Sequence, residues 1–363
     1  MIKIEKVKNI NTIINFMEPI WHKVYDSIVG IEQVNLMLEM YFSEKNLLKY
    51  LDDGLIYEDV FVNNNHIGII GYYIYEDYVY LDKMYFKEEY RGMHLASYIF
   101  NYLEDIKDII KLKANQENKY AIRCYLNNGF IITDSVVNEI KPGFVNYDYY
   151  FERNLKVLEQ KTISYIKDIF KDDFSGHDIE HSIRVYNNAM RIIKDEIANK
   201  YLVMLASLLH DVDDIKLFKD SNHLEEYLLS INTESFIINK IKEIISQVSF
   251  KGTDTMVPNT IEGKIVQDAD RLDALGAIGI ARTFAYGGSR NRKMYDFNDL
   301  PKLNMNAEEY FNNKNNTINH FYEKLLLLKD LMNTTKGKEL AIERHKFLES
   351  FLEQFISEVN GVK

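Results

Sequence analysis

Cysteine, proline and long apolar runs are scarce in this chain of 363 residues. Its one cysteine, Cys124, excludes an intramolecular disulfide framework and fits a reducing compartment. No stretch of about 18 uninterrupted apolar residues occurs, and the N-terminal "MIKIEKVKNINTIINF" has no apolar core followed by a small-residue cleavage site. These absences predict a cytoplasmic protein without a membrane partner.

Basic residues are too few for a general nucleic-acid binder. Lysine and arginine number 44 against 55 acidic residues, and the net charge of −11 offers no surplus to neutralise a phosphate backbone. Apolar residues make up 46% of the chain and charged residues 27%, as is typical of globular proteins. Because ordinary domains hold about 100 to 200 residues, the length predicts two domains.

Residues 1–153 mix helical and strand patterns. "IINFMEPIWHKVYDSIV" and "IEQVNLMLEMYF" have the apolar spacing of helices, and the aromatic and β-branched "LIYEDVFVNNNHIGIIGYYIYEDYVYLDKMYF" predicts strands joined by turns at "NNNHIG" and "YEDY". Two further helices, "RGMHLASYIFNYLEDIKD" and "NKYAIRCYLNNG", alternate with the strands "IIKLKA" and "FIITDSVV". We therefore expect an α+β domain with a mixed, mostly antiparallel sheet flanked by helices.

Residues 157–363 show the helical period nearly throughout, in segments such as "HDIEHSIRVYNNAMRIIKDEI" and "ESFIINKIKEIISQV". This pattern predicts an all-α helical bundle as the second domain. The join near "FERNLKVLEQ" contains neither proline nor glycine, so the sequence places the boundary only within several residues.

A strand, a turn and a helix follow one another in "MYFKEEYRGMHLASYIFNYLE", with Arg91 and Gly92 in the turn. Backbone amides at such a helix start are unsatisfied and, with the helix dipole, suit a pyrophosphate. The alternative is an ordinary turn. The region resembles the GNAT superfamily of N-acetyltransferases, because Arg91 and Ala96 match its acetyl-CoA loop, although His94 replaces the usual middle glycine. "ANQENKYAIRCYLNNGF" resembles the second signature of the family, matched at Asn115, Asn118, Ala121, Tyr125, Gly129 and Phe130.

The resemblance implies an enzyme that uses acetyl-CoA and an amine acceptor. Its implied cofactor-binding residues are Arg91, Gly92, His94, Ala96, Asn118 and Tyr125. Tyr125 would protonate the departing CoA thiolate, which a phenol can do chemically, or would simply belong to the core. No general base can be chosen from the acids near the loop. Because of His94, a degenerate domain that senses acyl-CoA or mediates association is the alternative.

Three apolar helices of the second half are interrupted by residues that bind metals. His210 and Asp211 end "LASLLHD", His177 and His181 lie four residues apart in "GHDIEHSIRV", and three aspartates interrupt "IVQDADRLDALGAIGIARTF". Burying unpaired acids costs several kcal/mol each, whereas one shared cation would compensate them all. The pattern therefore predicts a metal centre.

The order of these residues resembles the HD-domain superfamily of metal-dependent phosphohydrolases. The resemblance implies His181, His210, Asp211 and Asp270 as ligands, with Asp268 as the alternative to Asp270 and His177 as a supporting residue. Imidazole and carboxylate ligands suit Mn²⁺, Mg²⁺, Fe²⁺, Co²⁺, Ni²⁺ or Zn²⁺ without selecting one ion. The implied substrate is a small phosphorylated molecule, such as a nucleotide.

Catalysis would also need groups beside the ligands. We expect Asp214, or alternatively Asp213, to orient the attacking water, and Lys251 and Arg290 to bind substrate phosphate. The predicted protein is therefore bifunctional, a phosphohydrolase joined to an acetyltransferase. Both resembled families often form dimers, so a homodimer is also expected.

Overall fold

The computed structural model describes residues 2–171, 179–213 and 221–362. The chain divides into two compact units, Met1–Val157 and Leu158–Lys363. Helix α6, Leu155–Ile169, contains the division. Across the described ranges, the helices are all too short or too polar to cross a membrane.

Unit 1 is built on one sheet of seven strands in the order β1-β2-β3-β4-β5-β7-β6. The strands are β1 Ile2–Lys6, β2 Ile56–Val62, β3 Asn65–Ile74, β4 Tyr78–Phe86, β5 Ile109–Asn115, β6 Ile131–Lys141 and β7 Phe144–Arg153. The helices are α1 Ile10–Val29, α2 Ile31–Phe42, α3 Glu44–Asp52, η1 Glu88–Tyr90, α4 Leu95–Glu104 and α5 Lys119–Asn127. Only β4 and β5 pair in parallel, which confirms the predicted mixed, mostly antiparallel sheet. Strands β1 and β7 and helix α3 were not predicted.

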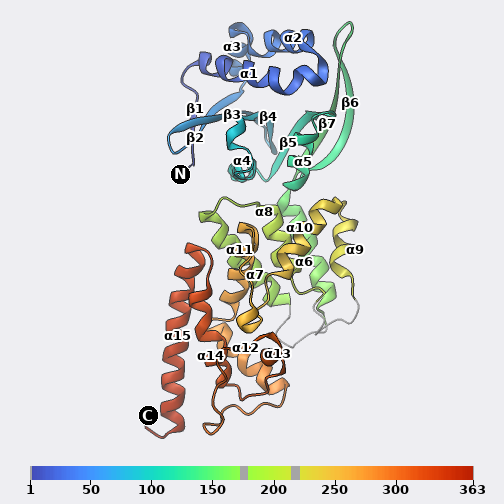
Figure 1. Ribbon diagram of the computed structural model, residues 1–363. Helices are drawn as coiled ribbons and strands as arrows, with labels where there is room; N and C mark the ends of the chain where they lie inside the picture. The colour runs from blue at the N-terminus through green and yellow to red at the C-terminus, as the bar shows by residue number, and fades with distance from the viewer. Residues whose placement is uncertain (1, 172–178, 214–220, 363) are drawn as a thin grey trace. The chain divides into compact units, whose positions relative to one another are not determined.

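Each face of this sheet has its own apolar core. Figure 1 shows α1, α2 and α3 on one face and α4 on the other. Met17 of α1 packs with Ile69 of β3, and Phe100 of α4 packs with Ile110 and Phe151 across the opposite face. These side chains are at most 1% exposed, so the strands are covered on both sides.

Strands β4 and β5 pair for only part of their length. Their register runs from Tyr78 opposite Ile109 to Leu81 opposite Leu112, and β4 then continues to Phe86 without β5 beside it. On its other edge β5 pairs with β7 from Ile110 to Asn115, so its last residues, Lys113–Asn115, pair with β7 alone. The parallel strands therefore diverge and leave an opening in the sheet, which we call the splay.

The regular secondary structure of unit 2 is all helical within its described residues, as the sequence predicted. After α6, its helices are α7 Ile179–Ile192, η2 Ile193–Asp195, α8 Lys200–Leu209, α9 His223–Ser230, α10 Ser235–Ser246, η3 Gly252–Asp254, α11 Ile261–Asp273, α12 Gly276–Ser289, α13 Ala307–Asn312, α14 Asn319–Glu323, η4 Leu325–Leu331 and α15 Thr335–Val359. Helices α7, α8 and α11 pack against one another, and every residue from Tyr201 to Leu209 of α8 is buried. This rigid apolar packing holds the ends of α7 and α8 against α11.

Candidate functional site

Two imidazoles and two carboxylates meet where α7, α8 and α11 pack together. His181 lies in the first turn of α7, His210 caps the C-terminus of α8, Asp211 follows it, and Asp270 comes from α11. Ligand atoms of His181, His210 and Asp211 all lie within 4.8 Å of one another. Asp270 Oδ1 lies 3.4 Å from His181 Nε2 and 4.0 Å from His210 Nε2. The geometry therefore places together all four residues that the sequence comparison implied as ligands.

Hydrogen bonds fix which ring nitrogen of each histidine carries the proton. His210 Nδ1 lies 2.9 Å from the carbonyl oxygen of Ser207, which can only accept, so Nδ1 donates. His181 Nδ1 lies 2.7 Å from Asp273 Oδ2 and donates to that carboxylate. In the neutral rings both Nε2 atoms are then acceptors, yet they face each other at 3.2 Å. Two facing lone pairs repel unless a proton or a metal ion lies between them, and because the carboxylates of Asp211 and Asp270 lie beside both nitrogens, the donor set fits a metal ion.

Asp273 orients the His181 ring by binding Nδ1, the nitrogen that does not face His210. Its carboxylate binds His181, accepts a hydrogen bond from Arg184 Nε at 2.7 Å and accepts one from Arg282 Nη1 at 2.6 Å. Burial alone would raise the pKa of Asp273, but these hydrogen bonds and charges lower it well below its usual range. Asp273 therefore stays ionised and keeps the His181 ring oriented. Sequence analysis noted this residue without assigning it a role.

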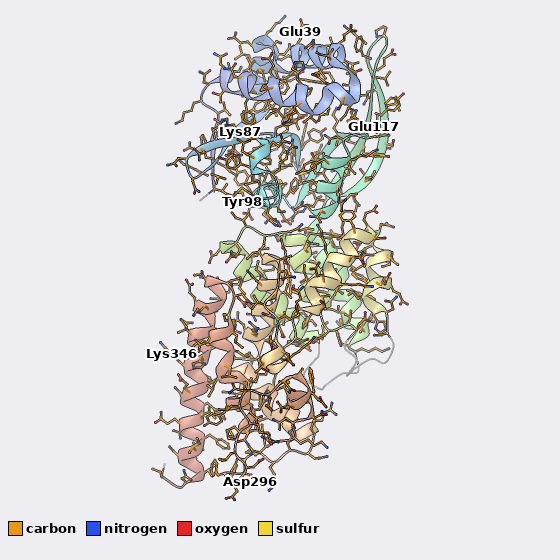
Figure 2. All side chains as sticks on the ribbon, in the orientation of Figure 1. Glu39, Lys87, Tyr98, Glu117, Asp296 and Lys346 are labelled. Atoms are coloured by element: carbon orange, nitrogen blue, oxygen red, sulfur yellow. The ribbon has the colours of Figure 1, made fainter. Side chains whose placement is uncertain are left out.

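The loop between β4 and α4 has the backbone of an anion site. Gly92 has φ of 82°, and His94, the N-cap of α4, has φ of 56° and ψ of 20°, in the left-handed region. Histidine tolerates this conformation better than most residues with a side chain, which explains how it stands where a glycine is usual. Lys87, labelled in Figure 2, follows the last residue of β4 and begins this loop.

The remaining residues implied for acetyl-CoA lie on or just before α4 and α5. Arg91 stacks over the ring of Tyr120 with its guanidinium 5.2 Å from the centroid, and Ala96 packs against the sheet core. The Asn118 side chain caps α5 by accepting a hydrogen bond from the Ala121 amide at 3.1 Å. Arg91 and Ala96 thus lie beside the start of α4, and Asn118 lies at the start of α5.

Tyr125 of α5 packs against the apolar core of unit 1, and burial changes the pKa of its hydroxyl. Its ring packs edge-on against Phe100 and Phe151 at centroid distances of 6.1 and 5.4 Å. Burial, with smaller effects from Cys124, Tyr25 and Tyr80, raises the pKa of Tyr125 far above its usual range. The phenol is therefore protonated at neutral pH and can donate its proton or a hydrogen bond.

Comparison with known proteins assigns each unit. The HD domain family model matches residues 178–275, and the GNAT acetyltransferase family model matches residues 21–130. The uncharacterized protein YpgQ of Bacillus subtilis is 35% identical over 217 residues, which are 58% of this chain and 97% of YpgQ. The chain belongs to the HD-domain family. It also carries a GNAT domain, and because the two families are hydrolases and acetyltransferases, the protein is an enzyme.

Two solved structures illustrate what unit 2 is similar to. A Lactobacillus plantarum protein is 38% identical with a TM-score of 0.53, over 57% of this chain and 98% of that one. An HD-superfamily hydrolase from Bacillus thuringiensis is 41% identical with a TM-score of 0.45, over 56% of this chain and 98% of that one. HD domains depend on metal and GNAT enzymes use acetyl-CoA, so His181, His210 and Asp211 are a candidate metal site.

Asp268 and Asp270 of the HD unit have different surroundings. Asp268 is fully buried and faces the start of α15, where it accepts hydrogen bonds from the backbone amides and side chains of Asn333 and Thr334. Asp270 faces His181 and His210. The carboxylate of Asp268 therefore anchors the start of α15. Of the two aspartates considered as the fourth metal ligand, the geometry favours Asp270.

The other predicted residues of the HD unit are not all near the cluster. Asp213 caps α9, because its carboxylate accepts hydrogen bonds from the His223 amide and the Ser221 hydroxyl, each at 2.8 Å. Asp214 and His177 lie outside the described residues. Within the described chain, neither Lys251 nor Arg290 makes a side-chain ion pair or hydrogen bond, and Arg290 lies over the Tyr286 ring at 5.5 Å.

Lys324, which the sequence did not reveal as a site residue, interacts electrostatically with the cluster. It follows α14, and its charge interacts with Asp270, Arg282 and Arg271, while burial lowers its pKa. Its ammonium lies 5.4 Å from the centroid of Phe250, whose ring packs edge-on against Tyr310. No short motif marks Lys324, because "HFYEKLLLL" reads as an ordinary amphipathic segment.

The strained His94 gives a direct test of the loop. We expect His94→Val to lower the stability of unit 1 by about 1–2 kcal/mol, because a β-branched residue fits the left-handed region poorly. The measurement is urea denaturation followed by fluorescence of Trp21, the one tryptophan of the chain, which is buried in α1. His94→Gly is the control and should show no such loss. Equal stability of the valine variant and the unmodified protein would contradict the left-handed assignment.

Proposed function

We propose that the HD unit hydrolyses a phosphate ester or anhydride of a small molecule, such as a nucleotide, with one divalent ion held by His181, His210, Asp211 and Asp270. The observation that carries this proposal is the pair of Nε2 atoms facing each other at 3.2 Å, with both Nδ1 protons committed elsewhere. A bound ion would supply a water of lowered pKa and would offset charge on the phosphate oxygens. Mn²⁺, Mg²⁺, Fe²⁺, Co²⁺, Ni²⁺ and Zn²⁺ all suit these ligands.

The side chains beside the ligands have separable roles in this proposal. Lys324 holds a phosphate oxygen, since its charge already acts on Asp270. Asp214 remains the residue proposed to orient the attacking water, because Asp213 is engaged at the start of α9. Lys251 and Arg290 remain proposed phosphate contacts at the outer end of a longer substrate. The rings of Phe250 and Tyr310 favour a substrate that contains a base.

Substrate screening tests this function. Nucleotides and sugar phosphates are incubated with the full chain and each divalent ion, and phosphate or pyrophosphate release is measured. We expect hydrolysis that stops when a chelator removes the ion and returns when the ion is restored. Turnover that persists with the chelator would refute the mechanism.

Removing the Lys324 charge should weaken substrate use. We expect Lys324→Met to lower kcat/KM at least about tenfold, because a charge-assisted contact to phosphate contributes about 1.5–3 kcal/mol. Steady-state kinetics on the best substrate of the screen measures this. Lys329→Met, on the following helix η4, is the matched control. If both variants lost activity equally, Lys324 would have no specific role in binding substrate.

We also propose that the GNAT unit transfers an acetyl group from acetyl-CoA to an amine. The left-handed Gly92 and His94 at the start of α4, together with the splay, support this proposal. Calorimetric titration with acetyl-CoA tests it, and absence of binding would refute it. Binding without transfer to any amine would instead favour a sensor, the function that the departure at His94 suggests.

We further propose a cytoplasmic location and a homodimer. The reducing environment implied by one free cysteine, Cys124, supports the first. Light scattering on the full chain tests the second, and a single species at the monomer mass would refute it.

A further inference from the structure

A buried carboxylate lies beside the splay of the GNAT unit. Asp148 of β7 is 6% exposed and stands in register with Asn115, in the part of β5 that has left β4. Within the described residues, no hydrogen bond reaches its carboxylate, and its one ion pair joins Oδ2 to Lys113 Nζ at 3.9 Å. Burying a carboxylate with so weak a partner costs free energy, which a bound donor would offset.

The charge of this carboxylate reaches tyrosines on three elements. The charge of Asp148 acts on Tyr25 of α1, Tyr41 of α2 and Tyr80 of β4, although burial is the main reason that their pKa values are raised. The hydroxyl of Tyr25 lies 3.3 Å from that of Tyr85. All four rings remain neutral at physiological pH, so Asp148 is the anionic member of this tyrosine cluster that lacks a close partner.

Tyr25 links the Asp148 side of the sheet to the acetyl-CoA side. Tyr25 packs on the α1 face, yet it interacts with Asn118 at the start of α5, on the opposite face. Tyr25 and Tyr80 also interact with Tyr125, the expected acid. Asp148 and Tyr125 thus both interact electrostatically with Tyr25 and Tyr80, as a base and an acid that serve one reacting centre would.

We propose that Asp148 is the base that accepts the ammonium proton of the acceptor, and that Tyr25, Tyr41 and Tyr80 enclose a primary amine with no acidic group beside its nitrogen. This inference rests on the proposed acetyltransferase function. Tyrosine faces attract an ammonium ion, and Asp148 receives one proton from it and passes that proton to water. The nitrogen lone pair then bonds to the thioester carbon of acetyl-CoA while the C–S bond breaks. Overall, one ammonium and one thioester give one amide, one thiol and one proton. A carboxylate on the acceptor would be repelled by Asp148.

Asp148→Asn tests the base. We expect kcat/KM for the acceptor to fall at least about 100-fold at pH 7, with partial recovery at higher pH as the free amine itself becomes abundant. Acetyl-CoA affinity by calorimetry and the thermal midpoint should stay close to those of the unmodified protein. Glu152→Gln is the matched control, because Glu152 also pairs with a β5 lysine from β7. Unchanged kinetics of Asp148→Asn would overturn the proposal.

Lys113→Met tests whether Asp148 acts as a base or has only a structural role. Lys113 lowers the pKa of Asp148, so its removal should shift the acidic limb of the kcat/KM profile to higher pH and leave the plateau unchanged. The tyrosines facing Asp148 stay protonated over this range, and Asp82 is paired with Lys83 at 2.5 Å. If Lys113→Met were as damaging as Asp148→Asn, the ion pair would be structural and the proposal would be wrong.

The acceptor class is tested with amines from methylamine to 2-phenylethylamine, each compared with its α-carboxylate counterpart, such as phenylalanine. We expect acetylation of the amines and at least about 100-fold lower kcat/KM for the carboxylated partners. Transfer only to the latter, or to none of the panel, would overturn the class. Failure of the unmodified protein to bind acetyl-CoA would overturn the acetyltransferase function itself, whereas binding together with an active Asp148→Asn variant would overturn only this inference.

Discussion

His210→Ala should abolish metal binding by the HD unit and with it all metal-dependent phosphate release. His210 supplies one of two Nε2 atoms that face each other at 3.2 Å, and its other nitrogen is held by the Ser207 carbonyl. Without that ring, His181, Asp211 and Asp270 remain as three donors, and the rigid end of α8 leaves a gap where the fourth stood.

Metal binding can be measured without knowing the substrate. An ion at about 100 times its dissociation constant stabilises a protein by about 2.7 kcal/mol, which raises its thermal midpoint. We expect Mn²⁺ to shift the unmodified protein in this way and to leave His210→Ala unshifted. His345→Ala is the control, because His345 is also buried in unit 2 but pairs with Glu349 on α15. An equal Mn²⁺ shift in His210→Ala would refute the ligand assignment.

The polar interruptions of apolar helices predicted a metal centre, and the resemblance to the HD-domain superfamily implied which residues hold the ion. The pair His210–Asp211 and the histidine at the start of α7 interrupt apolar helices, so their polar groups had to share a partner. Asp268 and Asp270 could not be separated, because the sequence does not reveal which side of α11 faces α7. Residues two apart lie about 200° apart around a helix, so only one could reach the histidines. The packing of α11 between α7 and α15 decided between them.

Residues placed by long-range packing escaped prediction. Lys324 reaches the cluster from a segment far along the chain with no motif of its own. Asp148 lies on β7, a strand that was not predicted, and it matters only because β4 and β5 diverge beside it. The left-handed backbone of His94 was likewise not predicted. The sequence shows that histidine replaces the glycine usual in the family, but it does not show which backbone conformation the histidine adopts.

Asp273→Asn should weaken metal binding by about 10- to 100-fold although Asp273 is not an expected ligand, because partners that orient a ligating histidine have effects of that size. The asparagine oxygen can still accept from His181 Nδ1, but its amide would meet the donors of Arg184 or Arg282. Losing a buried carboxylate among these partners should also cost about 3–5 kcal/mol of folding free energy. Calorimetric titration with Mn²⁺ and urea denaturation measure the two effects separately.

Asp268→Asn supplies the matched control, since it makes the same chemical change five residues earlier on the same buried helix. Asp268 anchors Asn333 and Thr334 at the start of α15 and makes no contact with His181 or His210. Its substitution should therefore destabilise unit 2 by several kcal/mol and leave the affinity for Mn²⁺ unchanged in the folded protein. If both variants lost affinity equally, the effect at Asp273 would reflect general loosening of α11. Weakened binding in Asp273→Asn alone would show that orienting the His181 ring is what that carboxylate contributes.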